Sequence, residues 1–155
     1  METRVEKDLA QAYAELKRQY DDLVSRNLAG IFRTTLDGRF VECNDAMARI
    51  LGYADRNALM ALNAHAIYHT KEDRERYLAT LHREKRMTNF EVRLKHRTGA
   101  EVIVLENVFL DEAPGRPTTI LGMLQDITGL KRYESEQRAL MAGFQSRLCG
   151  VPAVT

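Results

Sequence analysis

The first 27 residues carry a repeat of apolar positions that is typical of a long helix. Leu9, Leu16 and Leu23 recur every seven residues, and Tyr13 and Tyr20 stand between them. The mean spacing of about 3.5 residues is the period of a coiled-coil seam. We therefore expect residues 1–27 to form an amphipathic helix that pairs along this seam. The same stripe would also suit a helix that lies back on its own domain.

From residue 28 the pattern changes to short segments separated by turn residues, which predicts a folded domain over 28–129. Residues 31–36 and 39–43 are predicted strands, joined by a tight turn at Asp37-Gly38. Asn44 is suited to cap the helix that follows, and Gly52 is suited to end it. A second short helix is expected after Asp55, followed by a loop or one irregular turn over 63–69.

The second half of this domain contains one longer helix and three predicted strands. Thr70 begins a capping sequence, and its helix is expected to run to about residue 86. Apolar and polar residues then alternate over 90–95, and further strand-forming runs cover 102–110 and 118–128. Five strands in this order, with short helices between the second and third, indicate an α+β domain. We expect the helices to cover one face of an antiparallel sheet, with room for a cavity between.

The last part of the chain returns to a helical pattern. Tyr133, Gln137, Leu140 and Phe144 lie at heptad-like spacing. We expect a second terminal helix over 130–149 and a frayed tail over 150–155. The predicted organisation is therefore one domain between two terminal helices.

Composition and charge exclude several classes of protein. The 155 residues carry 23 basic and 22 acidic side chains, and a net charge of +1 argues against a dedicated nucleic-acid binder. No stretch approaches ~18 consecutive apolar residues, so we expect no membrane span and predict a cytoplasmic protein. Cys43 and Cys149 are too few for a disulfide framework or a zinc site. His65 and His69 lack a third ligand at useful spacing, so no metal site is predicted. The sequence contains no nucleophile elbow, phosphate-binding loop or dinucleotide-binding motif, so we do not expect an enzyme.

The order and spacing of several short motifs resemble a PAS domain, the sensory box of bacterial signalling proteins. The resemblance covers about residues 23–132. Its pieces are GIFRT at 30–34, LDGRF at 36–40, NDA at 44–46, LGY at 51–53, EDR at 72–74, FEVRL at 90–94, TG at 98–99, and DIT at 126–128 before Lys131-Arg132. Each piece is weak alone, and the DIT that leads into a charged helix is the most diagnostic. Thr35 departs from the Asp that is common in the family, and Thr70 or Lys71 stands where the family often has Pro.

The resemblance implies a five-stranded antiparallel sheet in the order 2-1-5-4-3, with a ligand cavity between its inner face and the helices. It also implies signalling rather than catalysis, in a homodimer whose terminal helices act as coiled-coil linkers. The partner would be an output domain such as a histidine kinase of a two-component system or a diguanylate cyclase. Asp126 and Thr128 stand where such domains pass the signal from the cavity to the C-terminal helix.

Two cofactors known in the family do not fit this sequence. Flavin-binding members resemble one another around a reactive Cys before the long helix, and residues 61–68, which occupy that region here, contain no Cys. Haem-binding members carry a ligand His on the long helix. Alignment through residues 72–74 places Tyr77 there, and His82 follows about one and a half turns later. We therefore predict neither flavin nor haem, and an unknown small molecule stays possible as a ligand.

Alternation along the strands and helical spacing predict which side chains face the cavity. The candidates are Phe32, Thr34, Met47, Ile50, Leu78, Leu81, Val92, Leu94, Val104, Glu106, Ile120 and Leu124. Most are apolar, so a filled core without a ligand is the alternative to a small apolar or weakly polar metabolite. Glu106 is the exception, because a buried carboxylate needs a partner and could hold a polar group of a ligand. Two hypotheses result: a ligand-sensing module, and a ligand-free structural module for dimerisation.

Overall fold

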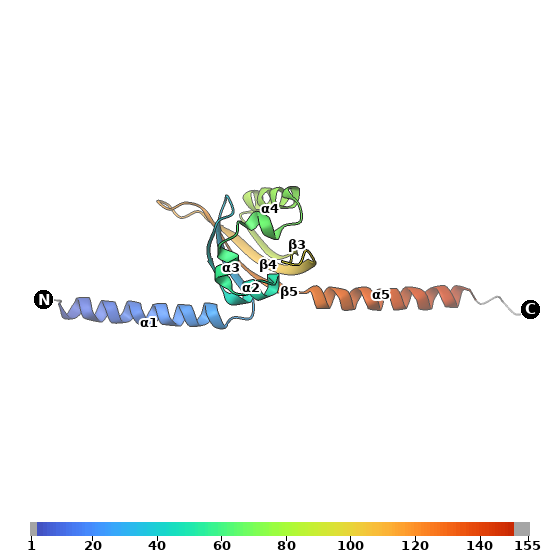
Figure 1. The fold of residues 1–155 in the computed structure, drawn as a ribbon, viewed down its shortest axis with the longest axis horizontal. Helices are drawn as coiled ribbons and strands as arrows, with labels where there is room; N and C mark the ends of the chain where they lie inside the picture. The colour runs from blue at the N-terminus through green and yellow to red at the C-terminus, as the bar shows by residue number, and fades with distance from the viewer. Residues whose placement is uncertain (1–2, 151–155) are drawn as a thin grey trace, which may run out of the picture.

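The order of elements along residues 3–150, which the computed structural model describes, is helix, hairpin, short helices, three strands and helix (Figure 1). Helix α1 (Arg4–Arg26) leads into β1 (Gly30–Thr35) and β2 (Phe40–Cys43). Helices α2 (Asp45–Leu51) and α3 (Arg56–Met60), the 3-10 helix η1 (Ala64–Ile67) and helix α4 (Lys71–Glu84) follow. Strands β3 (Arg86–Lys95), β4 (Glu101–Asp111) and β5 (Thr119–Asp126) complete the domain, and α5 (Thr128–Cys149) leaves it. The two terminal helices extend in opposite directions from one side of the domain (Figure 1).

The five strands form one antiparallel sheet in the order β2-β1-β5-β4-β3, which confirms the predicted fold. Strands β1 and β5, the first and last of the domain, pair in the middle of the sheet, with Phe32 opposite Gly122. A Cβ atom at residue 122 would fall well inside contact distance of the Phe32 ring. Glycine at this position therefore leaves the space that the ring occupies. Helices α2, α3, η1 and α4 enclose a core of apolar side chains against the inner face.

Capping residues set the ends of the short helices, as the sequence predicts. The side chain of Asn44 accepts a hydrogen bond from the backbone N of Met47 at 3.0 Å, which caps α2. Gly52 ends α2 with φ of 82°, a left-handed conformation that favours glycine. Asp55 and Thr70 cap α3 and α4 in the same way as Asn44 caps α2.

Asn44 also attaches α1 to the domain. Its Nδ2 donates hydrogen bonds to the backbone O of Val24 and of Ala29, each at 2.9 Å. Its Oδ1 accepts from the backbone N of Ile31 as well as from Met47, each at 3.0 Å. The side chain is buried, so these four bonds tie the end of α1 to β1 and α2 without competition from water.

The region between α4 and β3 differs from the prediction. Helix α4 ends two residues before the predicted position, because Lys85 adopts a left-handed conformation with φ of 64°. Strand β3 starts at Arg86 rather than at residue 90, with an irregularity between Met87 and Phe90. Asn89 lies within it and has φ of 50°. The bulge breaks the alternation of apolar and polar residues, so the first half of this strand carries no period-two signal.

The C-terminal junction is also shorter than predicted. Strand β5 ends at Asp126 and α5 begins at Thr128, whereas the sequence pattern placed the start of the helix at 130. Of the predicted frayed tail at 150–155, residues 151–155 lie outside the described part of the chain. No helix within residues 3–150 is long and apolar enough to cross a membrane.

Candidate functional site: a buried polar cluster

A small cavity lies between the inner face of the sheet and the helices. Its volume is about 10 Å³, which is room for about one water molecule. Seven of the twelve predicted residues line it: Phe32, Thr34, Met47, Leu94, Glu106, Ile120 and Leu124. The other five belong to the surrounding core. Leu81, Val92 and Val104 are buried there, and Ile50 and Leu78 pack against it while half-buried.

Five of the lining side chains are polar, and we call them the polar cluster: Thr34, Tyr68, Arg74, Tyr77 and Glu106. They come from four places in the chain, namely β1, the segment after η1, helix α4 and strand β4. All five are buried, and Arg74 and Glu106 are each only 3% exposed. Charged side chains are almost never this deeply buried unless they are paired, so the cluster requires an explanation.

Burial and neighbouring charge set the protonation of the cluster. Burial raises the pKa of Glu106 from 4.5 to about 7, while Tyr77 and Arg74 act in the opposite direction. Burial, together with the charge of Glu106, raises the pKa values of Tyr68 and Tyr77, so both phenols stay neutral near pH 7. The guanidinium carbon of Arg74 lies 5.4 Å from the centre of the Tyr68 ring, a cation–π contact.

Four polar atoms of the cluster make no hydrogen bond of good geometry to another atom of residues 3–150, although the Tyr77 hydroxyl lies close enough to the Glu106 carboxyl to lower its pKa. They are Nε and Nη2 of Arg74, the hydroxyl oxygen of Tyr77 and Oε2 of Glu106. Leaving a buried polar group without a partner costs about 1–3 kcal/mol, and more for a charged group. Apolar side chains of similar volume are often at least as stabilising as a buried ion pair. Stability alone therefore gives no reason for the cluster, whereas free donors and acceptors around a cavity are typical of a binding site.

Of the polar cluster, the sequence pattern identified Thr34 and Glu106 as cavity residues but missed Tyr68, Arg74 and Tyr77. Arg74 precedes Tyr77 by three residues and Leu81 by seven, so it lies on the inward face of α4. This periodicity was available in the sequence, but an arginine is normally assigned to the solvent side of a helix. Tyr68 lies outside regular structure, where periodicity carries no information.

Asp126 and Thr128 link the sheet to α5 through their side chains. The backbone N and the hydroxyl of Thr128 donate to Oδ1 of Asp126 at 2.9 and 2.6 Å. The backbone N of Ile103 donates to the Thr128 hydroxyl oxygen at 3.0 Å, which joins the first turn of α5 to β4. The cap position itself is Ile127, which makes no side-chain cap bond within the described chain. Asp126 thus bonds to the helix start from the residue before the cap.

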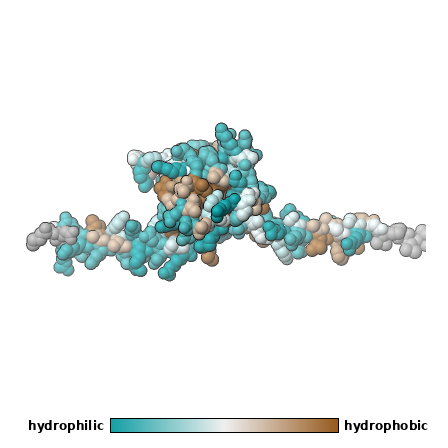
Figure 2. Space-filling view, viewed as in Figure 1, coloured by the Kyte–Doolittle hydropathy of each residue, from teal (hydrophilic) through white to brown (hydrophobic). Residues whose placement is uncertain are grey.

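The predicted seam of α1 faces solvent along its whole length. Its five residues, Leu9, Tyr13, Leu16, Tyr20 and Leu23, are between 47% and 72% exposed. Most of the helix therefore does not lie back on its own domain, and Figure 2 shows both terminal helices extending beyond the domain. Near its end, the Tyr20 hydroxyl donates to Oε1 of Glu42 at 3.0 Å.

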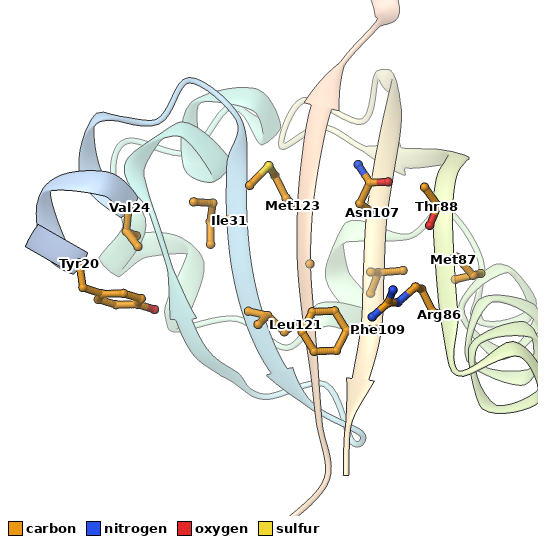
Figure 3. A pocket seen from close by; sticks show the side chains of 12 residues that line it. Tyr20, Val24, Ile31, Arg86, Met87, Thr88, Asn107, Phe109, Leu121 and Met123 are labelled. Carbon is orange, nitrogen blue, oxygen red and sulfur yellow. The ribbon is translucent and has the colours of Figure 1, made fainter. Parts of the chain in front are cut away.

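An apolar groove of about 580 Å³ lies on the outer face of the sheet. Figure 3 shows Ile31, Met123, Leu121 and Phe109, which come from neighbouring strands, along this face. Tyr20 and Val24 of α1 complete the lining on one side. The groove is thus continuous with the end of the exposed seam.

The family model of the PAS fold matches residues 18–127. A domain of a sensory box sensor histidine kinase/response regulator from Geobacter sulfurreducens has a TM-score of 0.57 and 21% identity, covering 72% of this chain and 94% of that chain. The PAS domain of an HTR-like protein from Haloarcula marismortui has a TM-score of 0.62 and 19% identity, covering 78% and 99%. The PAS domain of a LuxR-family transcriptional regulator from Burkholderia thailandensis, in complex with ethanol, has a TM-score of 0.59 and 12% identity, covering 70% and 97%. No curated protein sequence matches the chain. At these identities the structures show a shared fold.

Proposed function

The chain belongs to the PAS fold family, and we propose that it is a sensory module that binds a small ligand at the polar cluster. In this proposal residues 28–129 receive the signal, residues 1–27 pair two copies, and residues 130–149 pass the signal on. The receiver is an output domain such as a histidine kinase or a diguanylate cyclase. PAS domains of sensor kinases and of a transcriptional regulator share the fold, which supports a sensory role.

The observation that carries the proposal is the set of free polar atoms in the core. A domain that served only as a scaffold would gain stability from an apolar core at this place. The free edge of Arg74 and the free oxygen of Glu106 instead leave positions for a ligand. A ligand changes an output when it binds two conformations unequally, and polar groups that lack partners in one conformation supply that difference.

A short route connects the cluster to α5. Glu106 lies on β4, and the backbone of Ile103 on the same strand bonds to the Thr128 side chain at the start of α5. Ile127 N also donates to Ile103 O at 2.9 Å. A displacement of β4 at the cluster would therefore reach α5 through two hydrogen bonds at one residue.

The route can be tested in a chimera with a histidine kinase domain fused after α5. We expect Asp126→Ala and Thr128→Ala to change basal or stimulated kinase activity, while the domain loses only about 1 kcal/mol of stability, as for a deleted cap. Ser146→Ala is the matched control, because its hydroxyl bonds within α5, to Gly143 O. Kinase activity that both junction variants leave unchanged would reduce Asp126 and Thr128 to a structural role.

Pairing through α1 is supported by the exposure of its seam. We expect charged residues at Leu16 and Leu23 to produce a monomer that keeps its β-rich core, as measured by sedimentation and circular dichroism. Gln11→Lys with Ser25→Lys is the control, because these positions lie off the seam on the same helix. A double seam variant that still sediments as a dimer would show that another surface forms the interface.

The alternative is a ligand-free structural module for dimerisation. The small volume of the cavity, about 10 Å³, favours it, because a metabolite needs more room. Native mass spectrometry of the purified protein separates the two functions. A small molecule that stays bound supports sensing, and a chain that never carries one, together with silent junction variants, supports the structural module.

A further inference from the structure

The polar cluster leaves a pair of donors on Arg74, an acceptor on Glu106 and the Tyr77 hydroxyl, which can donate or accept, without a hydrogen bond of good geometry among residues 3–150. Nε and Nη2 of Arg74 lie on the same edge of the guanidinium, and their N–H groups match the two oxygens of a carboxylate. Oε2 of Glu106 accepts hydrogen bonds when the carboxyl is ionised. The two side chains carry opposite charges, so the cluster as a whole is not a simple anion site.

A larger space adjoins the cavity behind two aromatic rings. Tyr68 and Tyr77 line the internal cavity, and they also line a cleft of about 460 Å³ between α4 and β3. Their ring centres are 5.9 Å apart, with the planes tilted by 53°. The two rings therefore separate the cavity from the cleft. A movement of these rings that joined the two spaces would give a volume within the usual range for ligand sites.

Building on the sensory function proposed above, we propose that the cluster binds a small carboxylate with a hydrogen-bond donor beside it, as in an α-amino acid or an α-hydroxy acid. The ligand carboxylate lies against Nε and Nη2 of Arg74, and its donor bonds to Oε2 of Glu106. The ligand enters from the cleft between α4 and β3, past Tyr68 and Tyr77. Its remaining substituent occupies the cleft.

The charges of the cluster favour this class over plain carboxylates. An ionised Glu106 repels a second carboxylate unless the ligand also offers a donor to it. Burial raises the pKa of Glu106, so a bound ammonium group would favour the ionised form and displace a proton. Binding of an amino acid near pH 7 should therefore release protons, which calorimetry in buffers of different ionisation enthalpy detects.

Four compounds of matched size test the class by isothermal titration calorimetry on the full chain. L-alanine and L-lactate carry the carboxylate and a donor, propionate lacks the donor, and isopropylamine lacks the carboxylate. We expect binding of L-alanine or L-lactate, with propionate weaker by roughly tenfold or more, as for one lost charge-assisted hydrogen bond. Isopropylamine should not bind. The difference between L-alanine and L-lactate identifies an ammonium or a hydroxyl as the donor.

Variants test the assigned atoms. Arg74→Lys keeps the charge but removes the two-donor edge, so the preferred carboxylate should bind at least about tenfold more weakly. Arg83→Lys is the control, because Arg83 is exposed on the same helix. Glu106→Gln should reduce the preference for L-alanine or L-lactate over propionate. Circular dichroism verifies the fold of each variant, and the four compounds test the unmodified protein even if a variant fails to fold.

Several results would overturn the assignment. If propionate bound as tightly as L-alanine and L-lactate, Glu106 would not accept a hydrogen bond from the ligand as proposed. Equal affinities of the Arg74→Lys and Arg83→Lys variants would remove the role of Arg74. Absence of binding by all three carboxylates at millimolar concentration would reject the ligand class. The sensory function would survive that last result if native mass spectrometry found a different bound molecule or the junction variants changed kinase activity.

Discussion

Glu106 makes the stability of the domain depend on pH in a direction that is unusual for a carboxyl group. Most carboxylates in proteins stabilise the fold when they are ionised, but burial raises the pKa of Glu106 from 4.5 to about 7. The folded protein therefore holds this proton more tightly than the unfolded chain does. The stability that the protonated Glu106 carboxyl contributes is fully present below pH 4.5 and is lost as the pH rises through about 7.

The size of the effect follows from the two pKa values. One pKa unit corresponds to about 1.4 kcal/mol, so a rise from 4.5 to about 7 corresponds to about 3 kcal/mol between the ends of the window. The charged and titratable groups that face Glu106 are Arg74, Tyr68 and Tyr77. The raised pKa values of both phenols keep them neutral in this window. Within the cluster, Glu106 is the group that titrates in this window.

Urea unfolding of the wild-type and Glu106→Gln proteins between pH 4.5 and 8.5 measures the effect. Glutamine has the same shape but does not ionise, so the comparison cancels every contribution that the two proteins share. We expect the wild-type free energy of unfolding to fall relative to the variant as the pH rises, by up to about 3 kcal/mol. Glu72→Gln, at an exposed position in the first turn of α4, is the matched control for the loss of a carboxyl group. A flat difference for Glu106→Gln, or a wild type that gains stability with rising pH, would refute the raised pKa.

Three further predictions concern the rest of the domain. Asn44→Ala should cost about 3 kcal/mol or more in urea unfolding, because it removes four hydrogen bonds of a buried side chain. Asp55→Ala, which removes an exposed cap, should cost about 1 kcal/mol, and equal losses would contradict the role of burial. Gly122→Ala should cost about 1–3 kcal/mol, because the added methyl group would collide with the Phe32 ring. Adding Phe32→Leu should recover part of this loss in the same assay, and no recovery would contradict the contact. Because residues 61–68 contain no Cys, blue light should leave the absorbance spectrum of the purified protein unchanged, and a reversible bleach would contradict this.

The strands and helix ends could be predicted from the sequence because their signals are local, whereas the strand order 2-1-5-4-3 came from the resemblance to PAS domains. Asn44, Gly52 and Thr70 mark helix ends through their own side chains or conformations, and the structure places them as expected. The start of β3 could not be predicted in this way. Its first residues run through a bulge at Asn89, where the backbone conformation removes the alternation that marks a strand.

The polar cluster could be predicted only in part, and the reason differs from the bulge that hid the start of β3. Alternation decides which face of a strand is buried, so it correctly brought Glu106 inward. It does not decide where along that face a cavity lies, because the packing of α4 and η1 determines the position. Val92 and Val104 are therefore buried but belong to the core around the cavity. Arg74 was missed because a charged residue is normally assigned to the solvent side of a helix, even where its spacing places it on the inward face.

The position of the cavity relative to both terminal helices is a further argument for a sensory domain. Gly30, where β1 follows α1, pairs with Leu124 near the end of β5, so the two helices join neighbouring strands. A Cβ atom at Gly30 would lie 3.0 Å from Cδ1 of Leu124 and 3.0 Å from Sδ of Met47, and both side chains line the cavity. In the proposed function, a ligand that displaces either side chain would act on Gly30, where β1 begins after α1. The same ligand would act on the start of α5 through β4 and Thr128. The cavity is thus linked to α1 through the side chains that pack against Gly30 and to α5 through β4, which supports the proposed transfer of a signal between the two helices.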